Sequence, residues 1–307
     1  MGFDRMKFIF PAIALIASLA VIALPAASAA QNLDIKETTD HIYFDGPGSD
    51  NQRHRLNIVA PVTDTPTPLL MWIPGGAWAV GDRSRAMPIA RHIARAGITV
   101  AVIEHRMSPG AWMSPDFPDT GATHPDHIED AARAFAWLKV NARLFGADPD
   151  KIIVGGYSSG AHLSALLAMD PRYLSAHGLS PKDITAAIPV AGAYDMVSYY
   201  DVQIDELGPE KAAGHVLGVF GSPDVLEEAS PMTYLAGAHV PMLVISEADT
   251  YDYTRLFENA VGEEHKENLI QFIHNRNETH RSLFINLRSK GPDYQPRRDI
   301  IEYVLER

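Results

Sequence analysis

The 307-residue sequence contains no cysteine. Disulfide bonds, thiol nucleophiles and cysteine-ligated zinc sites are therefore excluded. Basic residues are also scarce, since 26 lysines and arginines stand against 38 aspartates and glutamates, and the formal net charge is −12. We expect no nucleic-acid partner, because neutralising phosphates requires clustered lysine and arginine. The sequence has no H-E-x-x-H zinc motif either, and His124-Pro125-Asp126-His127 is typical of a helix start, so we expect no metal site.

Long apolar runs are rare, and the one at the N-terminus extends from Phe8 to Leu24. Arg5 and Lys7 precede it, and Ala27-Ser28-Ala29 after it fits an A-x-A cleavage site. This pattern predicts a signal peptide over residues 1–29, and hence a secreted or periplasmic protein without a stable membrane anchor. The alternative is an uncleaved anchor, but the run is at the short limit for a membrane span.

Apolar runs alternate with helical patterns along the remaining chain. This alternation predicts an α/β protein with a doubly wound, mostly parallel sheet in one domain, residues 30–307. Weak periodicity at 196–238 favours a small cap or lid insertion there. The expected strands are 41–46, 54–61, 69–73, 98–106, 152–154, 184–195, 240–249 and 267–275. The expected helices are 87–96, 125–146, 159–169 and 297–305.

The segment Gly156-Tyr157-Ser158-Ser159-Gly160 matches G-x-S-x-G and stands between an expected buried strand and an expected helix. A sharp strand-to-helix turn exposes the central serine at the carboxyl end of the sheet, where open α/β sheets bind ligands. The register therefore predicts Ser158 as a nucleophile. The next residue, Ser159, would contribute its main-chain N–H at the start of the helix. The alternative is an ordinary glycine-rich connection.

These motifs give the chain a resemblance to a known group of proteins. The order "PGGAW", "EHRMSP", "IEDAARAFAWL" and "GADPDKIIVGGYSSGAHLSALLA" resembles the α/β-hydrolase superfamily. Within it, the chain is similar to the esterase and lipase branch that includes arylformamidase-like enzymes. The resemblance covers roughly residues 54–306 and implies the α/β-hydrolase fold.

In that superfamily the catalytic groups follow the chain order serine, acid, histidine. His280, in the loop expected after the last strand, matches the general base, and His274 is the alternative. Asp249, just beyond a strand, matches the acid that orients the imidazole. Asp252 and Glu247 are the alternative acids.

The segment "IPGGAW" resembles the superfamily's H-G-G-x-W loop, with Pro74 in place of the usual histidine. The resemblance implies an oxyanion hole formed by main-chain N–H groups of Gly75, Gly76, Ala77 and Ser159. The alternative is a tight turn at the end of a strand.

We expect Trp78 and Tyr157 to line the substrate pocket, although aromatic side chains are as often part of a core. The other aromatic residues considered for the pocket are Trp72, Trp112, Tyr199, Tyr200, Tyr251 and Tyr253.

The resulting hypothesis is a secreted serine hydrolase that cleaves a small-molecule carboxylic ester through a Ser-Asp-His triad and an acyl-enzyme, without a cofactor. One alternative is an arylformamidase-type amidase. The other is a non-catalytic binding protein built on the same fold. The sequence does not determine the oligomeric state.

Overall fold

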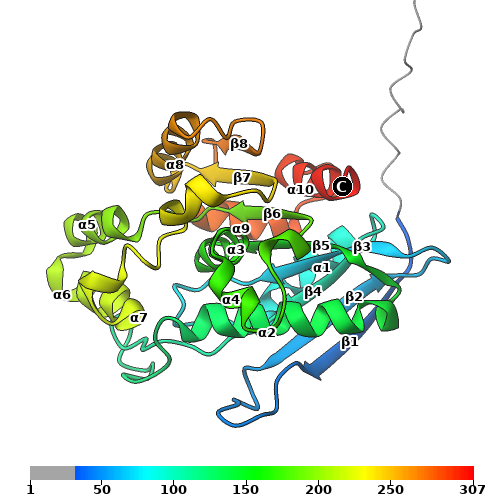
Figure 1. The fold of residues 1–307 in the computed structure, drawn as a ribbon, viewed down its shortest axis with the longest axis horizontal. Helices are drawn as coiled ribbons and strands as arrows, with labels where there is room; N and C mark the ends of the chain where they lie inside the picture. Colours follow the sequence, from blue (N-terminus) through cyan, green and yellow to red (C-terminus); the bar gives the residue numbers. More distant parts are fainter. Residues whose placement is uncertain (1–31) are drawn as a thin grey trace, which may run out of the picture. The chain divides into compact units, whose positions relative to one another are not determined.

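One eight-stranded sheet runs through residues 32–307, the part of the chain that this computed structural model describes (Figure 1). The predicted signal peptide, residues 1–29, lies outside the described residues. The strand order is β1-β2-β4-β3-β5-β6-β7-β8. β2 pairs antiparallel with both β1 and β4, and all other neighbours are parallel. The strands are β1 (Ile35–Ile42), β2 (Arg55–Pro61), β3 (Thr67–Ile73), β4 (Thr99–Ile103), β5 (Ala147–Tyr157), β6 (Ala186–Val190), β7 (Met242–Glu247) and β8 (Ile270–Asn275).

Helices cover both faces of this sheet, so the expected doubly wound α/β architecture is confirmed. One face packs on α1, α9 and α10, and the other packs on α2 and α3. Among the described residues, no helix has the length and apolar character that crossing a membrane requires. The helices are α1 (Met87–Ala94), α2 (Asp126–Asn141), α3 (Ser159–Met169), α4 (Pro171–Ser175), α5 (Met196–Leu207), α6 (Pro209–Ala212), α7 (Gly218–Phe220), α8 (Tyr251–Glu263), α9 (His280–Ser289) and α10 (Gln295–Leu305).

The central strands are the ones whose sequences are continuously apolar. From Leu69 to Ile73, β3 is buried on both faces because it lies between β4 and β5 and has helices above and below. Only the ends of these strands differ from the expected ranges. The strand expected at 184–195, for example, stops at Val190, because Ala191 takes a positive φ of 57°.

The first strand is the clearest correction. A strand was expected at 41–46, whereas β1 covers Ile35–Ile42 and pairs with β2 from Ile35 opposite Pro61. Because β1 is an edge strand, much of it is exposed and its residues are mostly polar. It therefore lacks the apolar signal by which the inner strands are recognised.

Between β6 and β7, residues 196–238 form the 12-residue helix α5, the short helices α6 and α7, and several single turns. Figure 1 shows α5, α6 and α7 gathered beside one another, away from β1. This is the segment expected to form a cap, and its α5 contributes side chains to the cavity described below. Two further helices, α8 with 13 residues and α9 with 10, were not expected from the sequence.

Candidate active site

Ser158 stands at the turn between β5 and α3, with φ 56° and ψ −121°. A non-glycine residue rarely adopts a positive φ, so the surrounding structure must hold it there. The two glycines of the motif allow the turn to close. A Cβ on Gly156 would lie 2.3 Å from the carbonyl oxygen of Gly160, and a Cβ on Gly160 would lie 2.0 Å from the oxygen of Ile73. The motif therefore forms the strained turn that the sequence predicted.

The imidazole of His280 faces the hydroxyl of Ser158, and Nε2 lies 3.0 Å from Oγ. His280 is the first residue of α9, which follows the loop after β8. The alternative base, His274, lies on β8, where Nδ1 is 2.7 Å from Ser246 Oγ and Nε2 is 3.0 Å from Glu258. His280 therefore has the position relative to Ser158 that a base needs in order to activate a serine, and His274 does not.

The carboxylate on the far side of the imidazole belongs to Glu247, and this corrects the expectation for the acid. Glu247 Oε1 lies 3.0 Å from His280 Nδ1. Asp249, the residue expected there, instead accepts a hydrogen bond from the main-chain N–H of His280 at 2.7 Å. Glu247 is the last residue of β7 and fully buried, whereas Asp249 lies two residues further along in an exposed turn. The other alternative, Asp252, is exposed on α8.

The surroundings of Glu247 favour its ionised form. Burial opposes ionisation, but the hydrogen bonds from His280 and from the main-chain N–H of Asp249 outweigh it, so the pKa of Glu247 is lowered. An ionised carboxylate at Nδ1 holds the ring with its proton on Nδ1, and this leaves Nε2 free to accept a proton from Ser158.

Tyr157 was expected to line the pocket, but it holds His280 instead. Its hydroxyl donates a hydrogen bond to the main-chain carbonyl of His280. Its ring also lies beside the imidazole, with the ring centroids 5.0 Å apart. Tyr157 is buried and is not part of the cavity lining, which differs from the expectation that it lines the pocket.

The glycine-rich loop after β3 lies against the start of α3. The main-chain N–H of Gly76 donates to Ser159 Oγ at 3.0 Å, so this N–H is already engaged, contrary to expectation. Neither Gly75 nor Gly76 lines the cavity, whereas Ala77 and Ser159 do. Ser159 is the first residue of α3, where an N–H has no partner within the helix. A role for the Ser159 hydroxyl was not foreseen.

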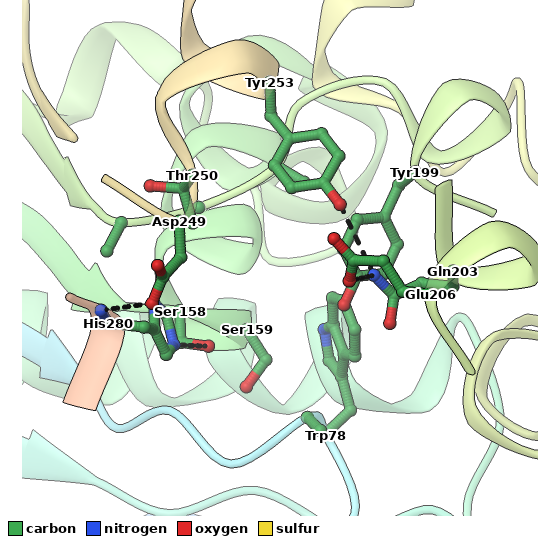
Figure 2. A pocket seen from close by; sticks show the side chains of 14 residues that line it. Trp78, Ser158, Ser159, Tyr199, Gln203, Glu206, Asp249, Thr250, Tyr253 and His280 are labelled. Atoms are coloured by element: carbon green, nitrogen blue, oxygen red, sulfur yellow. Dashed lines mark hydrogen bonds between the residues drawn. The ribbon is translucent and has the colours of Figure 1, made fainter. Parts of the chain in front are cut away.

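A cavity of about 430 Å³ opens beside Ser158 (Figure 2). Trp78 lines it as expected, and so do Tyr199 and Tyr253. Trp72 is buried in the core, and Trp112 stacks on His215 with the centroids 4.2 Å apart. The complete lining is Ala77, Trp78, Ser158, Ser159, Ala191, Gly192, Ala193, Tyr199, Gln203, Glu206, Asp249, Thr250, Tyr253 and His280.

Among the described residues, no group of three or more histidine or acidic side chains is arranged to hold a metal ion. In the stretch that begins at His124, His127 is buried and its Nε2 lies 2.8 Å from Ser108 Oγ. His127 is thus engaged in the packing at the start of α2.

The comparisons with known proteins agree with this architecture. The chain matches the BD-FAE family over residues 56–251, which is more than half of its length. It is 34% identical over 185 residues to the probable carboxylic ester hydrolase LipM of Mycobacterium tuberculosis, covering 58% of this chain and 40% of LipM. It is 31% identical over 195 residues to the esterase LipC of the same organism, covering 59% of this chain and 43% of LipC. The chain thus matches less than half the length of these curated relatives.

Solved structures share the fold over nearly the whole described chain. A truncated carbohydrate esterase from gut microbiota superposes with a TM-score of 0.67 at 22% identity, covering 91% of this chain and 98% of that one. Esterase B of Lactobacillus rhamnosis gives a TM-score of 0.68 at 17% identity, covering 90% and 85% respectively. At these identities the likeness shows a common fold.

Proposed function

The chain belongs to the BD-FAE family, and from that membership we propose that it is a carboxylic ester hydrolase with Ser158 as nucleophile. The observation that carries the proposal is the line of side chains from Ser158 Oγ through His280 to Glu247, with 3.0 Å at each step. The names of the relatives LipM and LipC, a carboxylic ester hydrolase and an esterase, support the same reaction class.

In the proposed reaction, Ser158 Oγ attacks the ester carbonyl while His280 Nε2 takes its proton. Glu247 stabilises the imidazolium that forms. The N–H groups of Ala77 and Ser159, which border the cavity beside Ser158, stabilise the oxyanion of the tetrahedral intermediate. The C–O bond then breaks, and His280 returns the proton to the leaving alcohol. Water, deprotonated by His280, attacks the acyl-enzyme and releases the carboxylic acid and free Ser158.

Hydrolysis of p-nitrophenyl acetate and labelling by a fluorophosphonate test this proposal. We expect the protein to turn over the ester and to become labelled at Ser158. Ser158→Ala should lose the label, and turnover should fall by at least about 10⁴-fold, because triad members act as a unit. A protein that is neither labelled nor active, with an unchanged Ser158→Ala variant, would support the non-catalytic alternative.

A panel of ester and amide substrates distinguishes an ester hydrolase from an arylformamidase-type amidase. We expect higher kcat/KM on p-nitrophenyl, feruloyl and acetyl-sugar esters than on N-formyl anilides. The opposite ranking would identify the amide-cleaving reaction as the principal one.

We also propose that the protein is exported from the cytoplasm and that residues 1–29 are removed, on the basis of the apolar run and the A-x-A sequence. Expression of the full chain in a bacterium, followed by N-terminal sequencing of the periplasmic fraction, tests this. We expect a new N-terminus at or near Ala30. An intact N-terminus in the membrane fraction would indicate an uncleaved anchor.

A further inference from the structure

The cavity has two chemically different ends. Ser158 and His280 lie at one end, and Figure 2 shows Trp78, Tyr199, Gln203, Glu206 and Tyr253 grouped at the other. We call these five residues the distal wall. Three of them lie on α5 of the cap segment: Tyr199, Gln203 and Glu206.

Aromatic rings form much of the distal wall, and they are tilted relative to one another. Trp78 and Tyr199 have centroids 6.3 Å apart at an interplanar angle of 75°. Tyr199 and Tyr253 have centroids 5.4 Å apart at 59°. Rings set at such angles present faces and edges to a shared space, which is the arrangement that surrounds quaternary ammonium groups in aromatic cages.

The charge on the distal wall is negative. Glu206 lines the cavity and has no ion-pair partner among residues 32–307. The buried amide of Gln203 donates to Glu206 at 3.4 Å and to the hydroxyl of Tyr253 at 3.3 Å. Its donors are therefore used within the wall. Among the residues that the structure describes, no lysine or arginine lines the cavity, and the second acidic residue of the lining is Asp249.

We propose that the distal wall is a subsite for a cationic group, of the ammonium class, carried by the ester substrate. The inference rests on the proposed function, because it assigns the other part of the ester to Ser158. The ring faces and the unpaired Glu206 carboxylate attract a cation. The carboxylates of Glu206 and Asp249 repel an anionic substrate, since no basic side chain among the described lining residues compensates their charge.

A pair of esters of nearly equal shape tests the proposal. Acetylcholine carries a trimethylammonium group, and 3,3-dimethylbutyl acetate replaces its nitrogen with carbon. We expect kcat/KM for acetylcholine to exceed that for the neutral ester by about tenfold, which combines one exposed cation–π contact with one solvent-screened attraction to the exposed Glu206 carboxylate. Glu206→Gln should reduce this preference severalfold. Tyr253→Leu should reduce it as well, whereas Tyr253→Phe, which keeps the ring, should retain it.

Glu210→Gln is the matched control, because Glu210 is an exposed glutamate on α6 that does not line the cavity. It changes the net charge equally and should leave the preference at its wild-type value. Equal rates on both esters, faster turnover of the neutral ester, or an unchanged preference in Glu206→Gln would overturn the proposal. Turnover of p-nitrophenyl acetate without turnover of either test ester would overturn it too.

Binding of choline alone keeps this test separate from the proposed function, because it needs no turnover. In a ligand-observed NMR titration, we expect choline to bind the wild-type protein and to bind Glu206→Gln several times more weakly. Choline binding in a protein without esterase activity would contradict the proposed function and retain the subsite. Esterase activity without choline binding would support the proposed function and contradict the subsite.

Discussion

His280 is held at three points by residues from two different strands and the turn after one of them. Glu247 contacts Nδ1, Asp249 accepts from the main-chain N–H, and Tyr157 donates to the main-chain carbonyl. The two carboxylates thus have separate tasks. Glu247 acts on the ring itself, and Asp249 fixes the backbone that carries it.

Glu247→Gln and Asp249→Asn distinguish these tasks. Glu247→Gln removes the negative charge beside His280 Nδ1. It should lower kcat by roughly 10³–10⁴-fold, because the imidazolium is no longer stabilised and the tautomer of His280 is no longer fixed. Asp249→Asn retains an oxygen that accepts the main-chain N–H of His280, and the hydrogen bond loses only its charge assistance. We therefore expect kcat to fall by no more than about tenfold. The pH profile of kcat/KM should keep its shape in Asp249→Asn. The reverse order of the two effects would assign the acid role to Asp249.

At the scale of secondary-structure elements, the loop after β3 and the first turn of α3 depend on each other. Gly76 has a φ of 151° and donates its N–H to Ser159 Oγ. A Cβ at this position would lie 1.7 Å from the carbonyl oxygen of Val80. The loop therefore closes over the helix start only if residue 76 has no side chain.

Gly76→Ala should displace the loop and with it the N–H of Ala77. We expect turnover of p-nitrophenyl acetate to fall by at least about 100-fold, as for removal of one oxyanion donor. Gly237→Ala is the control, because no atom lies within 4 Å of its added Cβ and its φ is not in the positive region. Thermal unfolding followed by circular dichroism would show whether the variants remain folded. Full activity in a folded Gly76→Ala protein would contradict the predicted dependence on this loop.

The sequence predicts best those elements whose signal is local. The inner strands are continuously apolar, and the turn at Ser158 is marked by its glycines, so both were found in the right places. The choice between Glu247 and Asp249 depends on which carboxylate projects toward His280, 33 or 31 residues further along the chain. Spacing alone does not contain that information. The aromatic residues of the distal wall were among the pocket candidates, but Gln203 and Glu206 were missed because they belong to a weakly periodic helix, where polar residues indicate only solvent exposure.

At the scale of the whole molecule, the packing of the cap segment against the sheet domain includes buried histidines. His162 Nε2 lies 2.8 Å from the carbonyl oxygen of Ala229, and the His162 ring packs on Trp78. His215 stacks on Trp112. Burial lowers the pKa of His162 to about 3 and that of His215 to about 4.

These histidines should make the protein sensitive to mild acid. Their unfolded pKa is near 6.5, so below that pH the unfolded chain binds protons that the folded chain does not, and the free energy of unfolding falls. The loss should begin near pH 6.5 and continue to about pH 4 and below, as the folded values are reached. Urea unfolding at pH 7, 5.5 and 4.5 measures it. His215→Phe, which keeps a ring to stack on Trp112, should show a shallower dependence, and an identical slope would contradict the assignment.

The contact between Tyr157 and His280 helps to keep His280 Nε2 close to Ser158 Oγ, as the proposed proton transfer requires. Tyr157 and Ser158 are neighbours in the chain, yet both contact His280, one at its main-chain carbonyl and the other at its ring. His280 follows the edge strand β8 in the chain, but its main chain is hydrogen-bonded to Tyr157, the last residue of the central strand β5. The Tyr157 hydrogen bond therefore opposes displacement of the His280 main chain when the sheet edge fluctuates. Ser158 and the main chain of His280 are thus both tied to the end of β5, one through the chain and the other through Tyr157.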